Sequence, residues 1–295
     1  MTEADWRAQR ITFELGRLVD TGTVKLWFHD AGGDGEPLFF LGGWTAAHFQ
    51  YDFVRPYLTG YRLLTWEPRG MGPSDCPDPA EHPYDLDVLS DDLRDLLSEI
   101  GVQRTHLWAG GFASYHALRF ARLYPELVGA LVTYNDVWAG DPQMSYDRIW
   151  EVYRTIVEQF GTKGIGARML AGSFGVNDPP WFLDWESANI DEGSHAETVE
   201  ALIGLGCLYA DVRDDLEHIK VPTLVLRGAR SWAGSELDER DDPSLELMRE
   251  RMPQLEVASI QGAHPGYAVV QKPEECGKVV RDFLARHPLP GTASA

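Results

Sequence analysis

The sequence predicts an α/β fold in which a mostly parallel, eight-stranded sheet carries helices on both faces. Short apolar runs of buried-strand length recur along the chain, and amphipathic helical segments lie between them. The length of 295 residues, with 44% hydrophobic and 11% aromatic content, is ample for a large packed core.

The predicted strands begin with an antiparallel pair. Ile11–Leu18 and Thr23–Phe28 flank a turn at Asp20-Thr21-Gly22. Six later apolar runs have the length and composition of buried strands: Leu38–Leu41, Arg62–Trp66, Thr105–Ala109, Ala130–Tyr134, Thr223–Arg227 and Leu255–Ile260.

Three core helices are predicted between or after these strands. Asp85–Ile100 has apolar residues at 86, 89, 93, 96, 97 and 100, which form one face of a helix. Ala113–Leu123 follows the strand at Thr105–Ala109 directly, and Pro273–Arg286 closes the fold. Because βα alternation places helices on both faces of a parallel sheet, these helices support the same fold.

The alternation breaks at residues 138–216, which are predicted to form a helical cap. An amphipathic helix around Ile149–Phe160 and a second at Glu197–Leu208 flank the aromatic stretch Pro179–Trp185. The cap is expected over the carboxyl ends of the strands, where open α/β sheets bind ligands. The predicted division is therefore a core of residues 1–137 and 217–288, a cap of residues 138–216 and a flexible tail of residues 289–295.

Composition and net charge limit the partners, location and cofactors that we expect for this protein. The net charge of −20 disfavours nucleic acid and anionic membrane as partners. No apolar run approaches the roughly 18 residues of a membrane helix, and Met1–Arg10 does not resemble a signal peptide. The three cysteines are widely spaced and suggest neither a disulfide framework nor a metal site. We expect a cytoplasmic protein without cofactor or metal, and the oligomeric state stays open.

Five motifs occur in an order that resembles the α/β-hydrolase family. They are Leu41-Gly42-Gly43-Trp44, the loop Glu67–Ser74, the stretch Leu107–Val128, the strand region Val221–Gly228 and Gly262-Ala263-His264. In that family they correspond to the strand ending in His-Gly, the Asp-x-Arg-Gly-x-Gly-x-Ser loop, the nucleophile turn with its helix, the strand before the acid, and the histidine loop. Within the second motif, Arg69 is expected to bond backbone carbonyls of its own loop.

The nucleophile of the family is missing. Its turn reads Gly-x-Ser-x-Gly and lifts a serine above the sheet. Here the stretch is Ala109-Gly110-Gly111-Phe112-Ala113-Ser114, so Gly111 holds the serine position between small neighbours. Ser114 stands on the first turn of the following helix and is not expected to project from the turn.

The usual acid is missing as well, whereas the histidine remains. Ser231 stands where the family places an aspartate, three residues beyond Gly228. Asn135-Asp136 follows an earlier strand, so Asp136 is a candidate to orient His264. His264 is the one candidate catalytic side chain, and a buried imidazole with a purely structural role is the alternative.

Backbone donors do not depend on the serine. The family's oxyanion hole uses the N–H of the residue after the nucleophile and one N–H from the loop after the third strand. The corresponding donors here are Phe112 and Trp44. Residues expected to line the surrounding pocket are Gly42, Gly43, Gly111, Asn135, Asp136, Trp138 and Trp232. The aromatic side chains favour a large, partly apolar ligand, whereas Trp108, on a buried strand, is expected to belong to the core.

The chain also resembles the peptide aspartate epimerases of bottromycin-type ribosomal peptide pathways, in its turn, its length and its reduced triad. That resemblance implies a modified-peptide substrate whose Cα–H, next to a carboxylate-bearing side chain, becomes exchangeable. His264 or the substrate's own carboxylate would be the base. The alternatives are a catalytically inactive ligand-binding protein, a hydrolase with an unrecognised nucleophile, and a cofactor-free dioxygenase.

Overall fold

The computed structural model describes residues 13–42, 47–111, 113–134, 155, 159, 188–195, 197–198, 211–229, 243–263 and 268–290. An eight-stranded sheet, in the order β1-β2-β4-β3-β5-β6-β7-β8, forms its centre. The strands from β3 to β8 pair in parallel, and β1 and β2 are antiparallel additions at one edge. The predicted fold class is confirmed.

The strand bounds follow the predicted runs closely outside the first pair. They are β1 Arg17–Asp20, β2 Lys25–Asp30, β3 Glu36–Leu41, β4 Tyr61–Glu67, β5 Thr105–Gly110, β6 Val128–Tyr134, β7 Thr223–Gly228 and β8 Leu255–Ile260.

The first predicted strand is wrong in its bounds. Phe13–Leu15 is a short 3-10 helix (η1), and β1 begins only at Arg17. The indole of Trp27 explains the interruption, because its Nε1–H donates to the Phe13 carbonyl at 2.9 Å and its ring meets the Phe13 ring edge-on. This contact holds the chain in a turn before β1, and Leu15 is 66% exposed.

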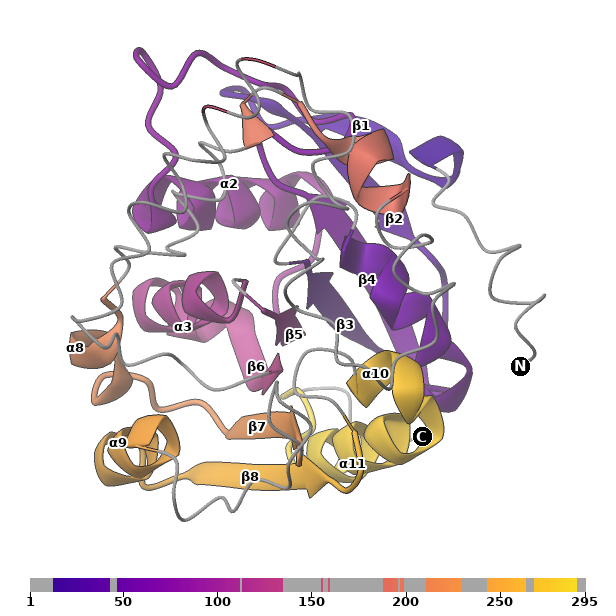
Figure 1. Cartoon of the computed structure of the whole chain (residues 1–295), viewed down its shortest axis with the longest axis vertical. Coiled ribbons are helices and arrows are strands. Elements are labelled where there is room, and N and C mark those ends of the chain that lie inside the picture. The colour runs from indigo at the N-terminus through magenta and orange to yellow at the C-terminus, as the bar shows by residue number, and fades with distance from the viewer. Residues whose placement is uncertain are drawn as a thin grey trace.

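Two groups of helices cover opposite faces of the sheet (Figure 1). On one side lie α2 (Leu86–Glu99), α3 (Ala113–Leu123), α8 (Arg213–Leu216) and α9 (Pro243–Arg251). On the other side lie the 3-10 helices η2 (Ala47–Phe53) and η3 (Arg55–Tyr57) with α10 (Ala268–Gln271) and α11 (Pro273–Ala285). A further 3-10 turn, η4 (Pro125–Leu127), links α3 to β6. In the part of the chain that the structure describes, no helix is long and apolar enough to cross a membrane.

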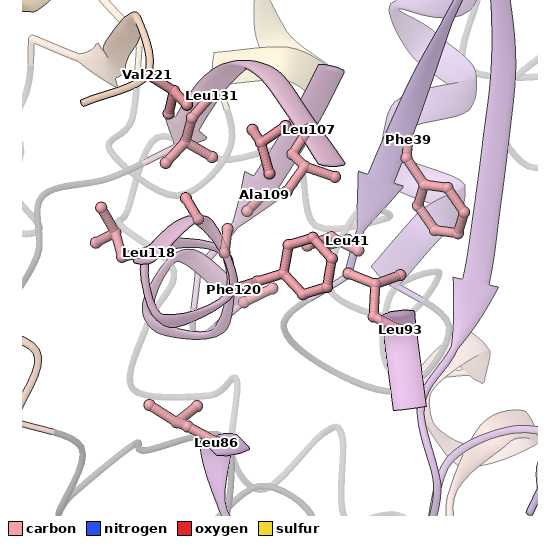
Figure 2. Close-up of a cluster of buried hydrophobic side chains, with 14 of the residues drawn as sticks. Phe39, Leu41, Leu86, Leu93, Leu107, Ala109, Leu118, Phe120, Leu131 and Val221 are labelled. Atoms are coloured by element: carbon pink, nitrogen blue, oxygen red, sulfur yellow. The ribbon is translucent and has the colours of Figure 1, made fainter. Parts of the chain in front are cut away.

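Each face of the sheet has its own apolar core. Under α2 and α3, Phe120 lies with Leu41 and Leu93 (Figure 2), and all three are fully buried. On the opposite face, Phe40 and Trp108 pack with residues of η2, α10 and α11. Trp108 is fully buried, so its assignment to the core is confirmed.

Most of the predicted cap lies outside the described residues. Residues 188–193 are helical, and the segment beyond them is tied to the loop after β4. The Gly72 N–H donates to the Gly193 carbonyl at 2.8 Å, and the Thr198 hydroxyl donates to the Gly70 carbonyl at 2.8 Å. The His195 imidazole also hydrogen-bonds the Gly72 carbonyl. The division into core and cap stays a prediction.

The last described residues pack against the amino ends of the strands. Leu289, at the start of the expected tail, is only 6% exposed. Its N–H donates to Glu36 at 2.9 Å, and the same carboxylate pairs with His106 at 2.9 Å. The chain is therefore fixed to the sheet at least as far as Leu289.

A buried ion pair holds the loop after β4. Arg69 makes two hydrogen bonds of 2.6 and 2.7 Å to the Asp92 carboxylate on α2, and both side chains are almost fully buried. Its bond to the Pro83 carbonyl is longer, at 3.4 Å. The expectation that Arg69 bonds backbone carbonyls thus missed its main partner, which lies on a helix 23 residues away in sequence.

Replacing one member of this pair should be costly. Asp92→Ala leaves a buried guanidinium unpaired, so we expect the free energy of unfolding to fall by about 3–5 kcal/mol. Asp30→Ala is the matched control, because Asp30 also binds one arginine, Arg62, but both side chains are about one-third exposed. That pair should contribute at most about 1 kcal/mol. Urea denaturation measures the free energy of unfolding of both variants, and equal losses in the two would contradict the buried ion pair's larger contribution.

His116 on α3 provides a pH-dependent contribution to stability. Its ring is buried beside Trp66 at a centroid distance of 5.8 Å and is hydrogen-bonded to the backbone of Leu89. Its Nε2 has no hydrogen-bond partner in the described structure. Burial, opposed by the bond to Leu89, lowers the pKa of His116 from 6.5 to about 4.

The sign of the effect follows from this shift. Between pH 6.5 and 4 the unfolded chain protonates His116 and the folded chain does not, so stability falls as the pH falls. The slope is about 1.4 kcal/mol per pH unit for one such group. We expect urea denaturation of His116→Phe at pH 7 to 4.5 to give a shallower decline than the parent. At pH 7 the difference in the free energy of unfolding between parent and variant measures the packing cost of the substitution alone. Parallel plots of this free energy against pH would refute the role of His116.

Candidate functional site

The turn between β5 and α3 forms the centre of the candidate site. β5 ends at Gly110, α3 begins at Ala113, and Gly111 between them has a φ of 55°. This left-handed conformation is one that glycine adopts without strain. The Ser114 N–H donates to the Gly111 carbonyl at 3.1 Å and closes the first turn of the helix. The tight turn expected at this position is therefore present.

In the part of the chain that the structure describes, the slot of the missing serine is open. Gly111 is exposed, and an ideal Cβ built on it would meet no atom within 4 Å among the described residues. The local backbone thus has room for a side chain that the sequence does not supply.

Ser114 and the two cysteines among the described residues do not replace the missing nucleophile. Ser114 is 1% exposed on α3, so its hydroxyl does not project from the turn, as expected. Burial, with Glu197 and Asp75 nearby, raises the pKa of Cys76 to about 11. Burial also raises the pKa of Cys276 to about 12. Because the thiolate is the reactive form, neither of these thiols is activated.

Gly42 and Gly111 are the two predicted site residues within the described structure, and Gly42 is buried directly after β3. The remaining predicted site residues lie outside the described residues: Gly43, Trp44, Phe112, Asn135, Asp136, Trp138, Trp232 and His264. Their predicted roles therefore stay predictions.

These residues nevertheless follow, in sequence, strands whose carboxyl ends lie at one edge of the sheet. β3, β5, β6, β7 and β8 run in parallel, so their carboxyl ends share one side of the sheet. Each of the eight residues follows one of these strands within four positions in sequence. This is the edge where ligands bind in open α/β sheets. Among the described residues, no group of three His, Cys, Asp or Glu side chains could hold a metal ion.

A comparison with family models matches residues 36–265 to the alpha/beta hydrolase fold. The chain belongs to the α/β-hydrolase family. The matched region runs from β3 past β8 and includes the turn at Gly111.

Curated relatives are distant. A non-heme chloroperoxidase of Kitasatospora aureofaciens is 25% identical over 284 residues, covering 88% of this chain and 95% of that protein. Epoxide hydrolase 1 of Caenorhabditis elegans is 26% identical over 140 residues, which is 47% of this chain and 34% of that protein. This chain thus matches only about a third of that relative's length.

Solved structures support the same fold. A bromoperoxidase of Bacillus anthracis has a TM-score of 0.73 at 20% identity, with 92% of this chain and 99% of that chain covered. An esterase of Exiguobacterium antarcticum has a TM-score of 0.74 at 18% identity, with 92% and 99% covered. At these identities the likeness concerns the fold alone.

Sequence reasoning missed Tyr51, which lies in η2 next to the end of β3. Its hydroxyl donates to the Leu41 carbonyl at 3.2 Å, and its ring is buried against Phe40. No motif marks this residue among the 11 tyrosines of the chain.

Restoring the serine should be structurally tolerated. Gly111→Ser places its Cβ clear of every described residue, so the expected cost is that of the positive φ, about 1–2 kcal/mol. Gly72→Ser is the matched control, because its φ is also positive, at 52°, but a Cβ there would lie 2.9 Å from both Glu67 and Phe13. Thermal denaturation should show a larger fall in Tm for Gly72→Ser than for Gly111→Ser.

A fluorophosphonate serine probe then reports on reactivity. We expect no labelling of the parent and labelling of Gly111→Ser, because only the variant has a hydroxyl at the turn, where His264 is assigned to act as its base. Labelling of the parent would reveal another nucleophile and revive the hydrolase alternative.

Proposed function

We propose that this protein is an α/β-hydrolase-fold enzyme that works without a nucleophilic serine, exchanging an α-proton of a peptide substrate as an epimerase or isomerase. The observation that carries the proposal is Gly111, which keeps the turn of the family with no side chain on it. An acyl-enzyme cannot form on glycine, so chemistry at this turn has to use other groups.

The backbone of the site suits enolate formation. In the proposed reaction a base removes the Cα proton, and the electron pair moves onto the neighbouring carbonyl oxygen. The N–H groups of Trp44 and Phe112 are assigned to hold that oxygen, as an oxyanion hole holds a tetrahedral intermediate. A solvent-derived proton added to the opposite face gives the epimer, and the base releases the proton that it took to solvent. His264 or a carboxylate of the substrate is assigned as this base.

The open slot supports a substrate that reaches the turn itself. With no Cβ at Gly111, an atom of the ligand can approach the start of α3 more closely than in a family member that carries serine. The expected aromatic wall of Trp138 and Trp232 favours a large and partly apolar ligand. A modified ribosomal peptide with an aspartate fits both features.

Solvent deuterium uptake tests the reaction. In D₂O we expect short peptides with an aspartate beside apolar residues to gain one deuterium at the aspartate Cα, measured by mass spectrometry and NMR. His264→Ala should abolish uptake if the imidazole is the base and leave it unchanged if the substrate carboxylate is. Peptides that bind but keep every Cα–H would contradict the reaction and favour a ligand-binding protein.

A further inference from the structure

Tyr51 joins the two strands that lead into the candidate site. Its ring stacks on Phe40 of β3 with centroids 4.3 Å apart and an interplanar angle of 24°. The same ring meets Trp108 of β5 edge-on at 5.6 Å. Phe40 and Trp108 are themselves register partners near the carboxyl ends of their strands. One side chain therefore packs across both strands just before the chain leaves the sheet.

The hydroxyl of Tyr51 acts on a specific peptide. It donates to the Leu41 carbonyl at 3.2 Å, and this carbonyl belongs to the peptide that joins Leu41 to Gly42. Tyr51 is only 4% exposed, and burial raises the pKa of its phenol, so the group stays a neutral donor. A buried hydroxyl is costly unless it is paired, and a phenylalanine would supply the same ring without one. The hydroxyl thus has a defined partner at the start of the loop.

A third element meets Tyr51's helix. η2 packs against α10, which begins at Ala268, four residues after His264. Phe53 and Val54 share one buried cluster with Ala268 and Val269. The packing around η2 therefore includes the ends of β3 and β5 and the helix that follows the histidine loop.

We propose that Tyr51 is a positioning residue for the Leu41–Gly42 peptide and the end of β5, the two backbone segments that lead in sequence to the assigned donors Trp44 and Phe112. The proposal rests on the proposed function, because the donors have a catalytic role only there. Phe40 and Trp108 set the lateral position of the ring, and the hydroxyl bond restrains the direction in which the chain leaves β3. Since an oxyanion site depends on donors held in a fixed geometry, this restraint bears on the rate rather than on the stability alone.

Amide hydrogen exchange of Tyr51→Phe tests the restraint without any substrate. We expect the amides of residues 42–46 to exchange about tenfold faster, because one buried bond at the loop's start is lost, with β3 and β5 unchanged. Tyr84→Phe is the matched control, since Tyr84 is 5% exposed and its hydroxyl donates to the Pro77 carbonyl at 2.7 Å, within the loop between β4 and α2. Unchanged exchange at residues 42–46, or the same rise in both variants, would overturn the proposal.

If the fluorophosphonate probe labels Gly111→Ser, this variant supplies a kinetic readout with p-nitrophenyl acetate. Adding Tyr51→Phe to it should lower kcat about tenfold and leave KM unchanged, whereas adding Tyr84→Phe should change neither. Unchanged kcat would overturn the positioning role. Failure of the proposed function gives a different result. The peptides then take up no deuterium in D₂O, while the faster amide exchange at residues 42–46 of Tyr51→Phe is still observed.

Discussion

The close approach of α3 to the sheet is the constraint on which the candidate site depends. Ala113, Ala117 and Ala121 recur at four-residue spacing, and all are at most 1% exposed under the helix. Ala109, at the end of β5, is equally buried and equally small. Because little side-chain volume separates helix and strand, the chain reverses between Gly110 and Ala113, and a residue with positive φ meets that demand. The position of the turn follows from this packing and not from any catalytic side chain.

The sequence predicted the fold where local pattern and tertiary packing agree. β8 and α3 have the predicted bounds, because their apolar residues match the period of one element and are flanked by turn signals. The predicted bounds of the N-terminal strand were wrong because an alternation of apolar residues carries no information about the Trp27 indole, which ties Phe13 into a turn. Residues 243–251 form a helix that was missed, since few apolar positions mark one face.

The candidate site was predictable to the extent that backbone determines it. Gly111 follows from the motif, and the burial of Ser114 follows from its place on the helix. Tyr51 did not emerge, since its role depends on Phe40 and Trp108, which the sheet alone brings together. Arg69 and Asp92 meet for the same reason, across α2 and the loop after β4. Contacts between elements far apart in sequence leave no local pattern to read.

The open space at Gly111 has an evolutionary consequence. The glycine codons GGT and GGC differ from the serine codons AGT and AGC by one base, and the described neighbours present no steric barrier to the added side chain. The strain of a serine in this turn, about 1–2 kcal/mol, is small beside the roughly 5–15 kcal/mol that stabilises a folded domain. A lineage could therefore pass between a serine-bearing and a serine-free member of this family at this position without passing through an unfolded protein.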